Sequence, residues 1–158
     1  MRAHRSLAFI SLVAIALAGG AIAFAQGHVM QALPDAKFGP APPMLPPGAE
    51  IAVLSGDPGK SAPYSVRLKF PANYAIPAHS HPTDENVVVV SGGVYMGMGN
   101  TLDRTAGQLL GVGGFALVPA GANHYAYTKV ASTIVLYGVG PVEFKYVNPS
   151  DDPRNTKK

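Results

Sequence analysis

The sequence contains no cysteine among its 158 residues. This absence excludes a disulfide framework, a zinc ribbon, thiol catalysis and a cysteine-held iron–sulfur cluster. Charged residues are also scarce, at 13% of the chain. Beyond residue 25, ten basic side chains stand against nine acidic ones, with no cluster of Lys and Arg to follow a phosphate backbone. We therefore expect no nucleic-acid partner.

The sequence also lacks any window with the 3.6-residue apolar period of a helix, and it has 18 glycines and 15 prolines. Apolar residues make up 47% of the chain, enough for the core of one domain. Residues 64–70 alternate polar and apolar side chains, as in a half-buried strand, and the apolar run 87–90 predicts a strand buried on both faces. Further short strands are predicted at 50–55, 94–98, 115–118, 125–130, 133–137 and 142–147. This spacing predicts an all-β sandwich or barrel.

The first 25 residues have the pattern of a signal peptide. A short positive start precedes an apolar run, and the small-residue pattern of a cleavage site follows at 23–25. A retained membrane anchor is the alternative, because the run is about long enough to span a bilayer. Cleavage would give a mature chain that begins at Gln26 and is periplasmic or secreted, with membrane contact limited to the signal segment.

We divide the remaining chain into a proline-rich arm (26–49), a barrel domain (50–147) and a polar tail (148–158). Six prolines lie between Pro34 and Pro47, and they stiffen the arm. We expect the arm to be an extended spacer or a strap over the domain, with a ligand for a proline-reading domain as the alternative. The tail is polar and contains two prolines, so we expect it to be frayed.

The domain contains only three histidines, and they carry the chemistry. His79 and His81 are two residues apart, so on an extended strand both imidazoles face the same side. Glu85 follows after a short excursion, and His124 comes from a distant segment directly after a turn. Three imidazoles and a carboxylate suit a divalent transition metal and leave positions open for water or substrate.

Two spaced motifs resemble those of the cupin superfamily. The first is His79-x-His81-xxx-Glu85-xxxxxx-Gly92, and the second is Gly113-xxxxx-Pro119-x-Gly121-xx-His124. Two positions depart from the pattern: Asn73 stands where the first motif opens with Gly, and Thr128 stands where the second often ends in Asn. The resemblance implies a jelly-roll β-barrel over residues 50–147 with one divalent metal inside. Its implied ligands are His79, His81, Glu85 and His124.

The resemblance leaves the reaction and the metal open, because one fold hosts many activities. The ion is expected to be Mn, Fe, Ni, Cu or Zn. The first hypothesis is a small metalloenzyme, an oxidoreductase, isomerase or lyase, that acts on an oxygen-rich small molecule. The second is a non-catalytic metal-dependent module that binds or senses a ligand, and the third is a protein whose metal is purely structural. A homodimer is a further expectation.

Overall fold

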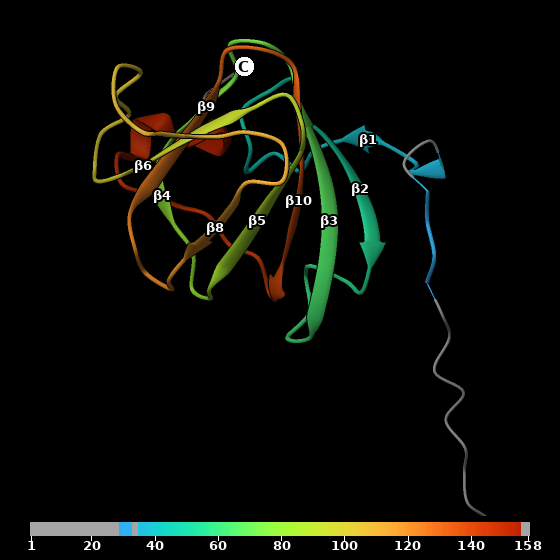
Figure 1. Ribbon diagram of the computed structural model, residues 1–158. Coiled ribbons are helices and arrows are strands. Elements are labelled where there is room, and N and C mark those ends of the chain that lie inside the picture. The colour runs from blue at the N-terminus through green and yellow to red at the C-terminus, as the bar shows by residue number, and fades with distance from the viewer. Residues whose placement is uncertain (1–28, 33–34, 156–158) are drawn as a thin grey trace, which may run out of the picture.

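The computed structural model describes residues 29–32 and 35–155 (Figure 1). The predicted signal peptide lies outside these residues. The described chain has almost no helix, which confirms the all-β prediction. It contains the following strands: β1 (Gly39–Pro40), β2 (Glu50–Ser55), β3 (Pro63–Phe70), β4 (Ala75–Ser80), β5 (Glu85–Ser91), β6 (Val94–Met98), β7 (Gln108–Leu110), β8 (Phe115–Val118), β9 (His124–Thr128), β10 (Ser132–Val139) and β11 (Lys145–Tyr146). Among the described residues, no helix is long and apolar enough to cross a membrane.

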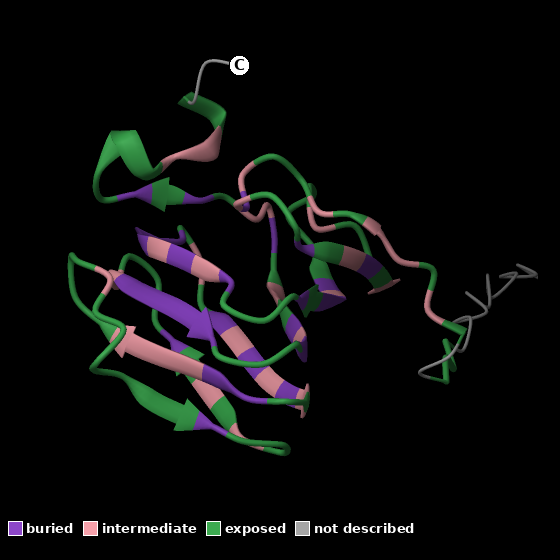
Figure 2. Ribbon diagram, turned by 90° about the horizontal axis from the view of Figure 1, so that it is seen from above, coloured by how far each residue is buried: buried purple, intermediate pink, exposed green. Residues whose placement is uncertain are grey.

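The strands form two antiparallel sheets, which pack face to face. Sheet A has the order β1-β2-β3-β10-β5-β8, and sheet B has the order β11-β4-β9-β6-β7. Consecutive strands such as β4 and β5 lie in different sheets, so the chain crosses repeatedly from one layer to the other. Figure 2 shows buried bands alternating with less buried ones along several strands, as expected when one face of each sheet is covered.

Strand β5 corrects one prediction. The run 87–90 was expected to be buried on both faces, but only Val87 and Val89 are buried, while Val88 and Val90 are half-buried. The reason is that, within the described part of the chain, no further layer fully covers the outer face of sheet A at β5. The apolar run therefore belongs to a strand with one covered face, and the core contains only every second valine.

The arm packs onto the barrel as a strap from residue 39 onward. β1 pairs with β2 through Gly39 opposite Ile51. Leu45 is only 6% exposed and belongs to the core. The hydroxyl of Tyr146 donates a hydrogen bond to the Met44 carbonyl at 2.7 Å, and that of Tyr74 donates one to the Pro46 carbonyl.

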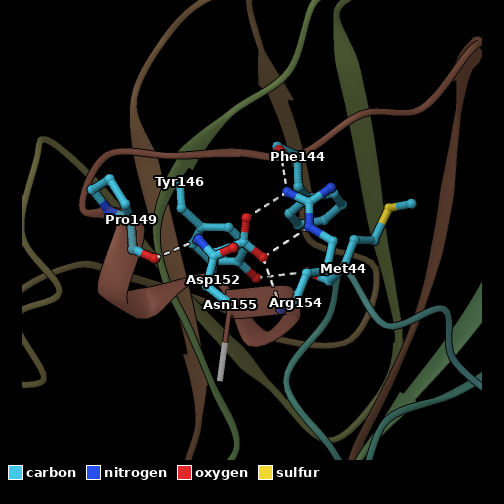
Figure 3. Close-up of polar contacts among 7 residues, drawn as sticks. All are labelled: Met44, Phe144, Tyr146, Pro149, Asp152, Arg154 and Asn155. Carbon is cyan, nitrogen blue, oxygen red and sulfur yellow. Dashed lines mark hydrogen bonds and ion pairs between the residues drawn. The ribbon is translucent and has the colours of Figure 1, made fainter. Parts of the chain in front are cut away.

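The tail is folded up to Asn155 rather than frayed. It forms two 3-10 turns, η2 (Pro149–Asp151) and η3 (Pro153–Asn155). Arg154 pairs with Asp152 at 2.7 Å and donates a hydrogen bond to the Phe144 carbonyl at 2.9 Å (Figure 3). The charged residues that led us to predict fraying instead form this ion pair and this hydrogen bond, which hold the tail on the barrel.

Candidate metal centre

The four predicted site residues come from β4, β5, β9 and the residue directly after β4, which meet at one end of the barrel. His79 lies in β4 directly opposite His124, the first residue of β9. His81 follows β4, and Glu85 is the first residue of β5 in the other sheet. All four are buried, with exposures between 1% for His124 and 7% for Glu85. The structure therefore brings together every site residue that the sequence predicted.

The three imidazoles form a compact cluster. One ligand nitrogen from each of His79, His81 and His124 can be chosen so that all lie within 4.8 Å of one another. The ring centroids are 4.2 Å apart for His79 and His124 and 4.9 Å apart for His79 and His81. Neutral imidazoles at this separation can bind a single ion between them.

Backbone carbonyls fix the orientation of each ring. The Nδ1 atoms of His79 and His81 lie 2.7 Å from the carbonyls of Pro77 and Glu143, and Nδ1 of His124 lies 3.2 Å from the Ala122 carbonyl. Because a carbonyl only accepts, each Nδ1 carries the proton and donates. The Nε2 lone pairs are then free, the arrangement that metal-binding histidines commonly have.

One buried atom gives the most direct test of whether these residues fit a metal. His81 Nε2 is buried and has no hydrogen-bond partner among the described residues; its polar neighbour is Glu85 Oε1, 3.4 Å away. A cation bound by the cluster would satisfy this nitrogen, so the site fits a metal on its own chemistry.

Glu85 lies against two of the three histidines. Its Oε1 is 3.4 Å from His81 Nε2, and its Oε2 is 3.3 Å from His124 Nε2. One carboxylate thus reaches both rings from sheet A, across the end of the barrel. This position allows Glu85 to bind the same cation and to balance its charge.

The electrostatics of the site keep His79 neutral. Burial, and then the neighbouring rings of His124 and His81, lowers the pKa of His79 to about 3. Burial also opposes the charge on His81, but the Glu85 carboxylate and the Glu143 carbonyl outweigh it and raise the pKa of His81. For Glu85, burial would raise the pKa, but His124 and His81 lower it well below its usual range. The ionised Glu85 carboxylate therefore favours a positive charge beside it, either a proton on a neighbouring imidazole or a bound cation.

An apolar wall surrounds the ligand atoms. Phe144 stacks on the His79 ring at 4.6 Å and meets His81 edge-on at 4.5 Å. A cavity of about 30 Å³ borders His79, Glu85 and His124, and its remaining lining is apolar. Sequence reasoning missed Phe144, because nothing in the local pattern of residues 142–147 distinguishes it from other core residues.

The two departures from the motif have local explanations. Asn73 has a φ of 60°, in the left-handed region that glycine adopts freely and Asn tolerates. Thr128, which is 1% exposed, donates a hydrogen bond to the Pro71 carbonyl at 2.8 Å and accepts one from the Tyr74 N–H at 3.1 Å. Both residues shape the turn at 71–74, away from the four clustered site residues.

A comparison with models of protein families shows which family the chain belongs to. The model described as "Domain of unknown function (DUF4437)" matches residues 37–158. The chain belongs to this family. The match includes the part of the arm that packs onto the barrel as well as the folded tail. No curated protein matches the sequence.

Solved structures confirm the predicted cupin fold. An acetylacetone dioxygenase from Acinetobacter johnsonii is 17% identical with a TM-score of 0.59, over 76% of this chain and 78% of that one. The polyketide cyclase RemF from Streptomyces resistomycificus is 18% identical with a TM-score of 0.59, over 78% and 89% of the two chains. An RmlC-like cupin from Shewanella frigidimarina is 13% identical with a TM-score of 0.55, over 78% and 96%. At these identities the likeness shows the fold alone.

Proposed function

We propose that this protein is a metal-dependent enzyme that holds one divalent transition metal between His79, His81, His124 and Glu85. The substrate would be an oxygen-rich small molecule. The buried cluster of three oriented imidazoles, with the Glu85 carboxylate beside two of them, carries this proposal. Such an ion, when bound, acts as a Lewis acid that polarises a substrate oxygen. A likeness in fold to two enzymes named for acetylacetone and polyketide chemistry supports this substrate class.

The protein's own residues would supply orientation and exclude water. The carbonyls of Pro77, Glu143 and Ala122 hold the imidazoles in place. Glu85 contributes negative charge beside the ion. Phe144 covers the ring face of His79 and meets His81 edge-on, so bulk water is kept from that side.

The metal content of purified protein tests the proposal. We expect about one divalent ion per chain, and loss of that ion in the double variant His79→Ala, His81→Ala with the β-type circular dichroism spectrum retained. His28→Ala is the control, since the sequence places His28 in the arm, outside both motifs. Full metal content in the double variant would overturn the assignment.

Turnover tests the enzymatic part separately. Oxygen-dependent and oxygen-independent screens of oxygen-rich small molecules should reveal an activity that requires the metal and is lost in Glu85→Ala and His124→Ala. Ligand binding without turnover in both screens would instead indicate a metal-dependent binding module.

We also propose that residues 1–25 direct export and are removed, which places the mature protein in the periplasm or outside the cell. This proposal rests on the sequence pattern of the first 25 residues.

A further inference from the structure

A second cavity lies beside the metal centre, between the arm and sheet A. Its volume is about 230 Å³. Pro42, Met44 and Leu45 of the arm form one side, and Ile51, Tyr64 and Val66 of β2 and β3 form another. Every side chain in its lining is apolar except that of Tyr64. We call this cavity the apolar chamber.

The apolar chamber is adjacent to the small cavity at the metal ligands. Four side chains line both spaces: Leu45, Leu68, Leu136 and Phe144. Since Phe144 stacks directly on His79, a single side chain separates the apolar chamber from a metal-ligating ring. A molecule that enters the apolar chamber therefore comes within one residue of the centre.

The sizes of the two spaces decide how a ligand can be placed. The cavity at the metal ligands, at about 30 Å³, is no larger than the share of liquid volume of one water molecule, also about 30 Å³. A substrate larger than that must extend into neighbouring space. Apolar cavities of about 150 Å³ bind benzene, so the apolar chamber has room for a substituted ring or a short alkyl chain.

Tyr64 places one polar group between the apolar chamber and the centre. The residue is 6% exposed, and its hydroxyl oxygen is not among the fully buried atoms that lack a hydrogen-bond partner. Tyr64 also lines a small space together with His81 and Glu85. A tyrosine hydroxyl that borders such a space can donate a hydrogen bond to a ligand oxygen.

We propose that the apolar chamber binds the apolar body of the substrate, a benzene-sized ring or a short alkyl chain. Its oxygen head group then faces the metal centre and accepts a hydrogen bond from Tyr64. The head-group part rests on the proposed function, whereas binding of the body does not. An open, more polar hollow of about 770 Å³ borders His81 and is lined partly by Glu143 and Lys145. A fully polar substrate would use that hollow instead, and the experiment separates the two.

A series of straight-chain carboxylates from acetate to pentanoate measures the contribution of the apolar chamber. Calorimetry with the Zn²⁺-loaded full chain should show binding that tightens roughly fourfold for each added methylene. In Ile51→Phe, whose ring would fill the apolar chamber, this gain should disappear. Val53→Phe on the same strand is the control, because Val53 is 50% exposed and lines neither cavity. If Ile51→Phe does not fold, Val142→Phe fills the apolar chamber from another segment.

Affinities independent of chain length, or equal losses in Ile51→Phe and Val53→Phe, would overturn the proposal in favour of the polar hollow. Tyr64→Phe should weaken carboxylate binding roughly tenfold and leave the gain per methylene intact. An unchanged affinity in Tyr64→Phe would remove the hydrogen bond from the proposal.

Toluene distinguishes failure of this proposal from failure of the metal. Added to metal-free protein, it should raise the melting temperature of the unmodified chain and of Val53→Phe, but not of Ile51→Phe. If toluene raises the melting temperature but the protein binds no Zn²⁺, the proposal for the apolar chamber stands and the metal centre is overturned. If the protein binds Zn²⁺ but toluene leaves the melting temperature unchanged, the metal centre stands and the proposal for the apolar chamber is overturned.

Discussion

Replacing Leu45 by alanine tests whether the arm is an energetic part of the barrel. Leu45 is 6% exposed and lines both cavities, so its side chain fills the space between them. Removing a buried leucine side chain costs about 2–5 kcal/mol, depending on how far the surroundings collapse. A cavity already lies on each side of Leu45, so little collapse is possible on those sides. The arm backbone, held by the bond from Tyr146 to the Met44 carbonyl, can move slightly inward. We therefore expect a loss of about 3 kcal/mol.

Urea and thermal unfolding measure this loss. For a domain of this size, a loss of about 3 kcal/mol lowers Tm by roughly 10 °C. Met30→Ala is the matched control in the arm, because Met30 is 92% exposed and its loss should change stability by less than about 0.5 kcal/mol. If Leu45→Ala unfolds within about 0.5 kcal/mol of the unmodified chain, the arm does not pack on the barrel in solution. The apolar chamber would then lose one of its sides.

Two further predictions concern pH and processing. Burial, and then the charge of Glu85, raises the pKa of Tyr64 to about 12, and burial is also the largest cause that raises the pKa of Tyr74 and of Tyr146. Since these tyrosines ionise near 10 when unfolded, their contribution to stability should be constant below about pH 10 and be lost as pH rises toward 12. Melting curves at stepped pH check this, and Tyr64→Phe should reduce the fall while Tyr137→Phe, at an exposed site, should not. For processing, N-terminal mass analysis of the exported protein should find Gln26 as the first residue, whereas intact chain that resists a high-salt wash of membranes would indicate a retained anchor.

The motif residues could be predicted from sequence because their spacing has a direct geometric meaning. In a strand, residues two apart face the same side, so His79 and His81 were expected to converge, and the structure places them in one cluster. The same period predicted the inward positions of β3, where Tyr64, Val66 and Phe70 are buried. The prediction for Val88 and Val90 was wrong, because it rested on a continuous apolar run, and such a run does not reveal whether a second layer covers the strand.

Residue types and local spacing thus determined the all-β class, the cupin motifs and the identity of the four clustered site residues. Only the tertiary structure decided what surrounds them. Tyr146 meets the arm across 102 residues, and Arg154 fixes the backbone of Phe144, the residue that covers His79. Such contacts depend on how two sheets, an arm and a tail pack against one another, and no local periodicity records that packing. The apolar chamber exists for the same reason, since its sides come from segments that only the folded barrel brings together.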